Sequence, residues 1–205
     1  MKQGTFKGSF LFCYDNPMNV PIDVSDTVLH TERLTLRPFR TEDLEDLYEY
    51  AKVDGVGQMA GWIPHKDIEE SRMILNMFME EKKTFALEHE GKVIGSLGIE
   101  AYNEEHFPEL ADVRCREIGY VLSKDYWGRG LVPEAVKEVV RYLFEDVGLD
   151  VILCGHFLWN RQSERVQEKC GFRHYAYDTF ETRSGKIEDN EMRILTREEW
   201  LESNK

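Results

Sequence analysis

A glycine turn ahead of a long helix is the segment of this sequence best suited to binding an anion. Between Trp127 and Val132, Gly128 and Gly130 lack a Cβ, so the backbone can fold tightly and its N–H groups can approach a ligand. The helix that follows offers unpaired N–H donors and the positive end of its dipole. This combination favours a pyrophosphate, and a plain turn without a ligand is the alternative.

Two familiar phosphate-binding patterns do not fit this turn. No Gly-Lys-Ser/Thr sequence follows it, so it is not a P-loop. The dinucleotide-binding fingerprint needs a third glycine and parallel strands, whereas the third glycine is missing and the neighbouring strand patterns are antiparallel.

A pair of polar residues begins a second helix pattern. Asn160 follows an apolar segment and Ser163 stands three residues later, so both side chains can face one cleft. Asn is also a preferred N-cap residue, which gives Asn160 a purely structural alternative.

The elements that must position these residues follow from the spacing of apolar side chains. Strands are expected at residues 32–39, 84–102 (two strands turning at Glu90-Gly91-Lys92), 113–123, 150–159 (buried on both faces) and 173–195 (a hairpin turning at Ser184-Gly185). Helices are expected at residues 40–52 (capped by Thr41), 67–83 (with Ile68, Met73, Ile74, Met77 and Phe78 on the apolar face), 130–148 and 160–172 (closed by Gly171). This layout predicts one α/β (α+β) domain at residues 29–200, after an extension of uncertain structure at residues 1–28.

The composition is that of a soluble globular protein of 205 residues, 41% of them hydrophobic, with a formal net charge of −13. Binding to nucleic acid or to an anionic membrane needs an excess of Lys and Arg, so neither partner is expected. The N-terminus does not resemble a secretory signal and no apolar run could span a bilayer. The sequence therefore predicts a cytoplasmic protein.

The cysteines are Cys13, Cys115, Cys154 and Cys170, and none stands at metal-ligand spacing. The sequence predicts four free thiols in a reducing compartment and no bound metal.

Two motifs stand in a distinctive order, YWGRGLVPEA at residues 126–135 and the pattern NxxSxxVxEKxGF at residues 160–172. Together they resemble the GNAT superfamily of N-acetyltransferases. The segments TERLTLRPFRTEDLEDLYEY (31–50) and GKVIGSLGI (91–99) are similar to its branch of ribosomal-protein N-terminal (alanine/serine) acetyltransferases. The resemblance covers about residues 29–196.

The resemblance implies acetyl transfer from acetyl-CoA to a primary amine, by direct attack on the thioester. The acceptor would be a protein N-terminus or a small cationic amine, and a homodimer is left open. The implied fold is a mixed, mostly antiparallel sheet with helices on both faces. A bulge in the strand at 113–123 would splay the sheet between the fourth and fifth strands.

The family's CoA contacts fall on three segments of this chain. Main-chain amides of the glycine turn would hold the pyrophosphate, the strand before it would pair with the pantetheine arm, and the Asn–Ser pair would line the thiol side. The matching residues are Tyr120, Val121, Leu122, Trp127, Gly128, Arg129, Gly130, Leu131, Val132, Asn160 and Ser163.

Four positions depart from the family's pattern. Trp127 replaces the usual Gln or Arg, and Val132 replaces a small residue. Gln167 stands where many members have a tyrosine acid, and Tyr175 stands where the ribosomal branch has a glutamate. Both usual catalytic side chains are therefore missing.

Acetyl transfer still needs a base for the amine, a donor to the oxyanion and a hydrogen bond to the leaving thiolate. Ser163 is the candidate for the thiolate, and the amide of Val121 or a neighbour is the candidate for the oxyanion. Glu117 and Glu100 are the candidate bases, with solvated or ion-paired strand residues as the alternative for each.

Two further side chains could move protons. His156 could be a base, although a hydrogen-bonded core histidine is the favoured interpretation, and Tyr175 could be an acid. Without a usual acid or base, a non-catalytic acetyl-CoA sensor or interaction module is the alternative function. Another type of nucleotide-binding enzyme is disfavoured by the missing P-loop lysine.

Overall fold

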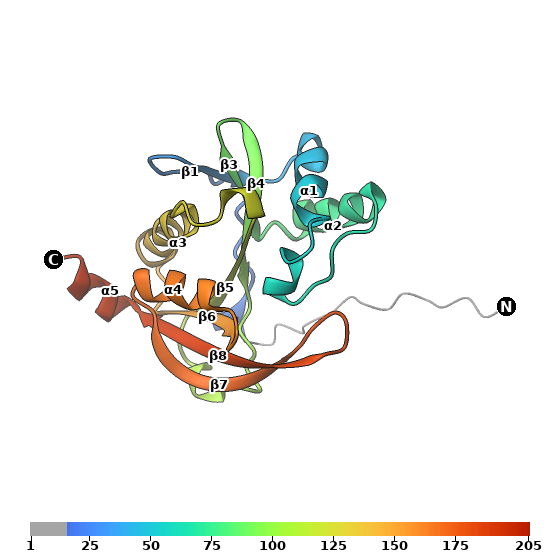
Figure 1. The fold of residues 1–205 in the computed structure, drawn as a ribbon. Helices are drawn as coiled ribbons and strands as arrows, with labels where there is room; N and C mark the ends of the chain where they lie inside the picture. Colours follow the sequence, from blue (N-terminus) through green and yellow to red (C-terminus); the bar gives the residue numbers. More distant parts are fainter. Residues whose placement is uncertain (1–15) are drawn as a thin grey trace.

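The computed structural model describes residues 16–205, which form one eight-stranded sheet with helices on both faces (Figure 1). The strands are Leu29–His30 (β1), Thr35–Pro38 (β2), Thr84–His89 (β3), Lys92–Glu100 (β4), Cys115–Leu122 (β5), Val151–Phe157 (β6), Arg173–Glu181 (β7) and Ile187–Thr196 (β8). Their order across the sheet is β1-β2-β3-β4-β5-β6-β8-β7. All neighbours are antiparallel except β5 and β6. The predicted mixed, mostly antiparallel sheet is confirmed.

The helices divide between the two faces of the sheet. They are Leu44–Ala51 (α1), Ile68–Glu81 (α2), Leu131–Tyr142 (α3), Arg161–Lys169 (α4) and Arg197–Ser203 (α5). α1 and α2 pack against Ala86 of β3 and Val121 of β5. α3 and α4 cover the other face, where Ile118 and Leu122 of β5 join the larger core (Figure 1). The alternation of side chains along a strand therefore puts β5 in contact with both layers.

The sheet opens between β5 and β6. These parallel strands pair only over Cys115–Glu117 and Val151–Leu153. Beyond that point β5 stays with β4 along its length, while β6 stays with β8 as far as Phe157. The predicted splay is confirmed, but the predicted bulge in β5 is wrong, because its register with β4 continues without a shift. The divergence comes instead from each strand following its antiparallel partner.

The N-terminal segment is partly built into the domain. Val24 is 1% exposed within the main core, and Asn19 is buried with its amide donating to the Tyr102 carbonyl oxygen at 3.2 Å. The short strand β1 was not expected from the sequence. It is only two residues long and is stabilised by pairing with β2, which a local pattern cannot show.

Two local predictions about the early helices are wrong. Thr41 does not cap α1: a 3₁₀ turn over Thr41–Asp43 precedes the helix, and the Asp43 carboxylate accepts from the Arg40 amide at 2.7 Å. On α2, the predicted residues Ile68 and Phe78 pack against the core beside Leu75, which is 1% exposed, but Met73 is 63% exposed. The predicted cap and the buried position of Met73 are therefore wrong, while Ile68 and Phe78 are confirmed.

Cys115, Cys154 and Cys170 are buried free thiols, as predicted, and Cys13 lies outside the described residues. Among residues 16–205, no helix has both the length and the apolar character needed to cross a membrane.

Candidate active site

A pocket of about 360 Å³ lies where β5, the glycine turn and α4 meet. Ten of the eleven residues predicted to contact CoA line it. They are Tyr120, Val121, Leu122, Trp127, Gly128, Gly130, Leu131, Val132, Asn160 and Ser163. The structure thus brings three segments, which together span about 40 residues of the sequence, into one cavity.

Arg129 is the predicted contact that does not line the pocket. Its guanidinium donates to the Asp125 carbonyl oxygen at 2.8 Å and lies 4.9 Å from the centre of the Tyr126 ring. These contacts hold the side chain against its own turn. The charged groups that do line the pocket, Arg165 and Lys169, come from α4 and were not predicted.

The glycine turn has the backbone shape that glycine permits. Gly128 and Gly130 have φ values of +76° and +78°, a region that other residues rarely adopt. Gly130 is the N-cap of α3 and its first turn receives no side-chain cap. Because Pro133 has no N–H, the free donors of this first turn are the amides of Leu131 and Val132. Both residues line the pocket, so an anion could accept from these donors.

The turn is braced by residues that the sequence analysis missed. Arg33, just before β2, donates to the Arg129 carbonyl oxygen at 2.9 Å and to Glu134 at 2.7 Å. The Arg33 backbone amide donates to the other oxygen of Glu134 at 2.8 Å. These bonds join two segments about 100 residues apart. In the sequence, the only indication of them is that Arg33 lies in the segment at residues 31–50, which resembles the family.

The open gap beside β5 exposes particular backbone amides. Ser123 donates to the Ile94 carbonyl oxygen at 2.7 Å, so its N–H points toward β4. Because direction alternates along a strand, the Val121 amide also points toward β4, while those of Tyr120 and Leu122 point toward the gap. The neighbours of Val121, rather than Val121 itself, are therefore the backbone donors that a ligand in the gap can reach.

Asn160 and Ser163 belong to the N-terminal cap of α4 and also line the pocket. Asn160 caps α4, since its side chain accepts from the Ser163 amide at 3.1 Å, and its own amide donates to the Met59 carbonyl oxygen at 3.2 Å. The Ser163 hydroxyl lies 2.8 Å from Tyr120 Oη and accepts from Gln167 Nε2 at 3.3 Å. Burial raises the pKa of Tyr120 well above its usual value, so this phenol stays protonated.

The two candidate bases lie outside this pocket, opposite each other on β4 and β5. Glu100 forms an ion pair with Lys83 at 2.6 Å, which agrees with its interpretation as an ion-paired strand residue rather than a base. Burial, together with the charges of Glu100 and Asp178, raises the pKa of Glu117 to about 7. Glu117 is thus a carboxyl able to exchange a proton near neutral pH.

Glu117 faces away from α3 and α4. It lies on the same face of β5 as Gly119 and Val121, while Ile118, Tyr120 and Leu122 point to the other face. A Cβ built at Gly119 would meet no atom within 4 Å, so this face is open beside Glu117. The carboxyl and the Tyr120–Ser163 pair therefore lie on opposite faces of the sheet.

His156 and Tyr175 are both engaged elsewhere. His156 is 5% exposed and its Nδ1 lies 3.0 Å from Gln167 Oε1, as expected of a satisfied core histidine. The Tyr175 hydroxyl donates to Glu109, and its ring packs on Phe107 outside the pocket. Tyr175 sits on β7, on the far side of β8 from β6, so this candidate acid does not lie in the pocket.

Comparisons with known proteins agree with this geometry. Residues 33–173 match the model of the acetyltransferase (GNAT) domain family. The chain is 29% identical over 152 residues to an uncharacterized N-acetyltransferase, YoaA, of Bacillus subtilis (71% of this chain, 82% of YoaA). It is 36% identical over 92 residues to an FsC-acetyl coenzyme A-N(2)-transacetylase of Aspergillus fumigatus, spanning 43% of this chain and only 39% of that protein.

Among solved structures, a GNAT-family acetyltransferase from Bacillus anthracis superposes with a TM-score of 0.72 and 25% identity, covering 84% of this chain and 99% of that one. The family match spans more than half of the sequence, and the fold and the glycine turn agree with it. The chain belongs to the GNAT family of acetyltransferases.

Proposed function

We propose that this acetyltransferase moves the acetyl group of acetyl-CoA to a cationic primary amine, either a protein N-terminus or a small molecule, with Glu117 as the base. The observation that carries the proposal is the position of Glu117. It is a carboxyl with a pKa near 7 on the open sheet face, across β5 from the pocket that holds Ser163.

The pocket supports a CoA molecule running along the gap between β5 and β6. The amides of Leu131 and Val132 would donate to the pyrophosphate at the start of α3. The gap-facing amides of Tyr120 and Leu122 would pair with the pantetheine arm or donate to the oxyanion. Arg165 and Lys169 line the same pocket and add positive charge beside a ligand that carries several phosphates.

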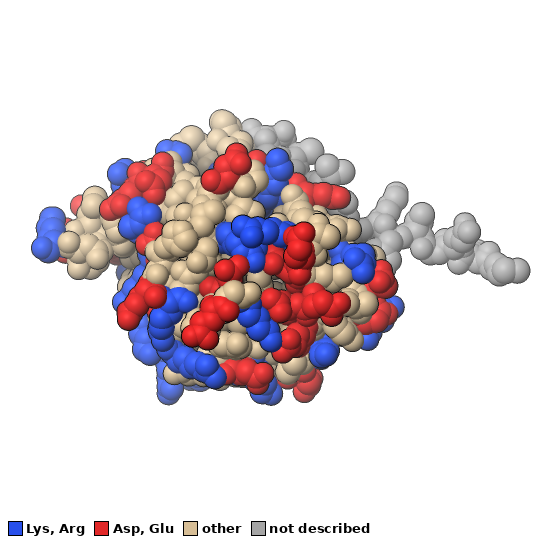
Figure 2. All heavy atoms as spheres, turned by 90° about the horizontal axis from the view of Figure 1, so that it is seen from above, with Lys and Arg blue, Asp and Glu red and all other residues tan. Residues whose placement is uncertain are grey.

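The amine would approach from the opposite face. Gly119 pairs with Gly98 of β4 beside the two glutamates, and the space above Gly119 is open, whereas the Glu100 side chain lies over Gly98. The charges of Glu117, Glu100 and Asp178 favour a cationic group there. Figure 2 shows Asp and Glu side chains gathered on the half of the molecule that holds α1 and α2, in keeping with a cationic acceptor.

The chemistry then follows from this placement. The ammonium gives one proton to the Glu117 carboxylate, and the neutral nitrogen attacks the thioester carbon. The oxyanion accepts from an amide in the gap, and the C–S bond breaks as the nitrogen gives its second proton to solvent. The CoA thiolate leaves on the other face, where the Ser163 hydroxyl donates to the sulfur and solvent supplies the proton.

The test is release of free CoA thiol by the purified protein with acetyl-CoA and a panel of amines. The panel contains peptides with a free N-terminus, the same peptides with a blocked N-terminus, polyamines and neutral aromatic amines. We expect release with a cationic primary amine and at least a hundredfold slower turnover in Glu117→Gln. Tight acetyl-CoA binding without acceptor-dependent thiol release would instead support the sensor.

A further inference from the structure

A line of hydrogen bonds runs from the pocket into the interior behind Ser163. Gln167, on α4, is 1% exposed, and its Nε2 donates to Ser163 Oγ at 3.3 Å. Its Oε1 lies 3.0 Å from Nδ1 of His156 on β6. Gln167 stands where the resemblance led to the expectation of a tyrosine acid, and its amide cannot protonate a thiolate.

The direction of each bond in this line is set by its partners. Gln167 Nε2 also lies 3.1 Å from the Gly155 carbonyl oxygen, which can only accept, so this atom is the amide nitrogen. The opposite atom, Oε1, can only accept, so His156 must carry its proton on Nδ1. Gln167 Nε2 also lies 3.2 Å from Cys154 Sγ, so Ser163 Oγ is one of three acceptors for its two hydrogens, and the glutamine is held at both ends.

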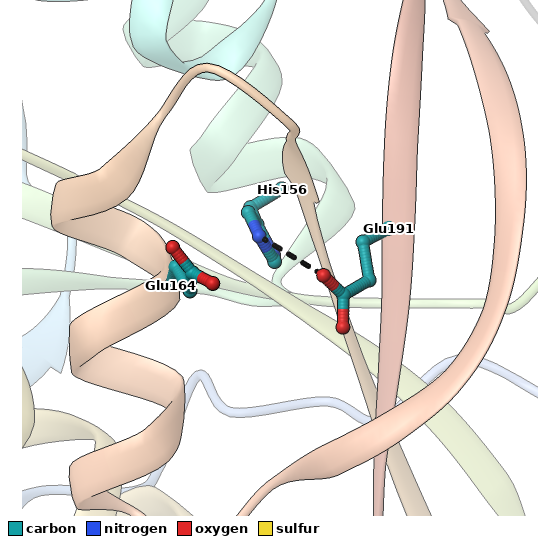
Figure 3. Close-up of side chains that lie close together, drawn as sticks. All are labelled: His156, Glu164 and Glu191. Atoms are coloured by element: carbon teal, nitrogen blue, oxygen red, sulfur yellow. Dashed lines mark ion pairs between the residues drawn. The ribbon is translucent and has the colours of Figure 1, made fainter.

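His156 is anchored on its other side by carboxylates. Figure 3 shows the ring between Glu164 of α4 and Glu191 of β8, with Glu191 Oε2 3.6 Å from His156 Nε2. The ligand atoms of these three residues all lie within 4.8 Å of one another, a spacing that would suit a divalent cation. Arg193 already supplies a positive charge here, since its guanidinium is 3.0 Å from Glu191 and 3.9 Å from Glu164. Arg193 therefore offsets the charge of the two carboxylates that flank the imidazole.

We propose that Gln167 is a positioning residue for acetyl transfer, and that His156 fixes its amide so that the Ser163 hydroxyl donates to the departing sulfur. A hydroxyl oxygen accepts two hydrogen bonds and donates one. Gln167 fills one acceptor site, and the Tyr120 hydroxyl, 2.8 Å from Ser163 Oγ and 3.3 Å from the Ser163 carbonyl oxygen, can fill the other when its proton points to Oγ. The serine proton is then left for the sulfur. The inference rests on the role proposed above for Ser163.

A double-mutant cycle separates this role from ordinary packing. Gln167→Met keeps the length and volume of the side chain but cannot donate. Ser163→Ala is expected to lower kcat by roughly 10- to 100-fold, and Gln167→Met by about tenfold, with the KM for acetyl-CoA changed less than about twofold. In the Ser163→Ala background, Gln167→Met should lower kcat no further, because the hydroxyl it positions is gone.

The outcomes distinguish the two proposals. An unchanged kcat in Ser163→Ala overturns the role of Ser163 and, with it, this inference. A large effect of Ser163→Ala together with an equal loss from Gln167→Met in both backgrounds leaves the serine in its role and overturns the positioning role of Gln167.

A second readout does not depend on turnover. Bound CoA is titrated by the ultraviolet absorbance of its thiolate, which a donating Ser163 stabilises. We expect the thiol pKa to rise in Ser163→Ala and in Gln167→Met, and to rise less in His156→Phe, which keeps the ring volume but removes the Nδ1 donor. A thiol pKa in Gln167→Met equal to that of the wild type would overturn the proposal, even if that variant is less stable.

Discussion

At the scale of single residues, Glu117 is a carboxyl in surroundings that oppose its charge. Burial is the largest cause, and the nearby carboxylates of Glu100 and Asp178 add to it, which together raise its pKa to about 7. A base must be ionised to accept a proton, so a pKa near the working pH serves catalysis and costs stability.

The first prediction concerns the pH profile. At saturating acetyl-CoA, kcat/KM for the amine should rise with pH and change slope near pH 7, because only the Glu117 carboxylate accepts the proton. Glu117→Gln should lack this step while keeping any step due to the amine itself. Wild type and variant are compared with one amine, so that the titration of the amine cancels. A variant that retains the step near pH 7 would remove Glu117 as the base.

The second prediction concerns stability. A folded-state pKa above the unfolded value of about 4.5 means that the folded protein binds this proton more tightly. The contribution of Glu117 to stability is thus fully present below pH 4.5 and is lost as the pH rises to 7. This difference in pKa corresponds to at most about 3 kcal/mol in the free energy of unfolding. The actual contribution is smaller, because Glu117 is partly exposed and solvent screens its charge.

Glu117→Gln should therefore raise the free energy of unfolding by about 1–2 kcal/mol at pH 8 and change it little at pH 4. Urea denaturation at the two pH values measures both differences. Equal differences at both pH values would show that the carboxyl is not held at a raised pKa.

At the scale of elements, the glycine turn depends on a brace from the other end of the chain. Arg33 bonds to the Arg129 carbonyl oxygen and to Glu134, so it fixes the turn relative to α3. Glu134→Gln should weaken CoA binding severalfold, because the turn loses its contact with Arg33. The free energy of unfolding should change by less than about 1 kcal/mol, as for exposed ion pairs.

Isothermal titration with CoA tests this brace. If Arg33 were instead a phosphate ligand competing with Glu134, then Glu134→Gln would free the guanidinium and tighten CoA binding. The sign of the change therefore decides between the two roles.

The paired strands β4 and β5 form the floor of the proposed amine site. A Cβ at Gly119 meets nothing within 4 Å and the position needs no positive φ, so Gly119→Val should fold normally. The added methyl groups should obstruct the amine and raise its KM roughly tenfold. The KM for acetyl-CoA should stay unchanged, since CoA lies in the gap and on the other face. Steady-state kinetics with each substrate varied in turn distinguishes the two effects. A rise only in the KM for acetyl-CoA would show that acetyl-CoA, rather than the amine, binds on the face of Gly119.

At the scale of the whole molecule, the net charge of −13 is distributed unevenly. On the face seen in Figure 2, Asp and Glu gather on the side that holds α1 and α2, while both signs are mixed on the side that holds α3 and α4. This arrangement places negative charge on the side proposed for the amine.

The amine reaction should therefore depend on ionic strength. Raising the salt from 0.02 to about 0.5 M should lower kcat/KM for a polyamine severalfold, because screening shortens the reach of the acidic surface. A neutral aromatic amine is the matched control and should show little change. Equal salt effects on the two amines would argue against steering by the acidic half.

The sequence by itself determined the elements and the family. Apolar spacing predicted the strands and helices, and the glycine turn and the Asn–Ser pair, together with the family resemblance, indicated ten residues that line the pocket. The shape of the glycine turn and the cap at Asn160 could be predicted because glycine conformation and helix capping are local properties. The errors at Thr41 and Met73 arose because Asp43 accepts hydrogen bonds from Arg40 and Arg37 at the helix start, and because Met73 lies on the exposed side of α2.

Only the tertiary structure decided which side chains act together. The pKa of Glu117 depends first on its burial and then on Glu100 and Asp178, the latter about 60 residues away, and the glycine turn depends on Arg33, about 100 residues away. In the sequence, Gln167 stands in the place of a tyrosine acid. In the structure, its amide lies between His156 and Ser163. Electrostatic and hydrogen-bonding partners are set by proximity in space, and β5 creates that proximity by leaving β6 while staying paired with β4.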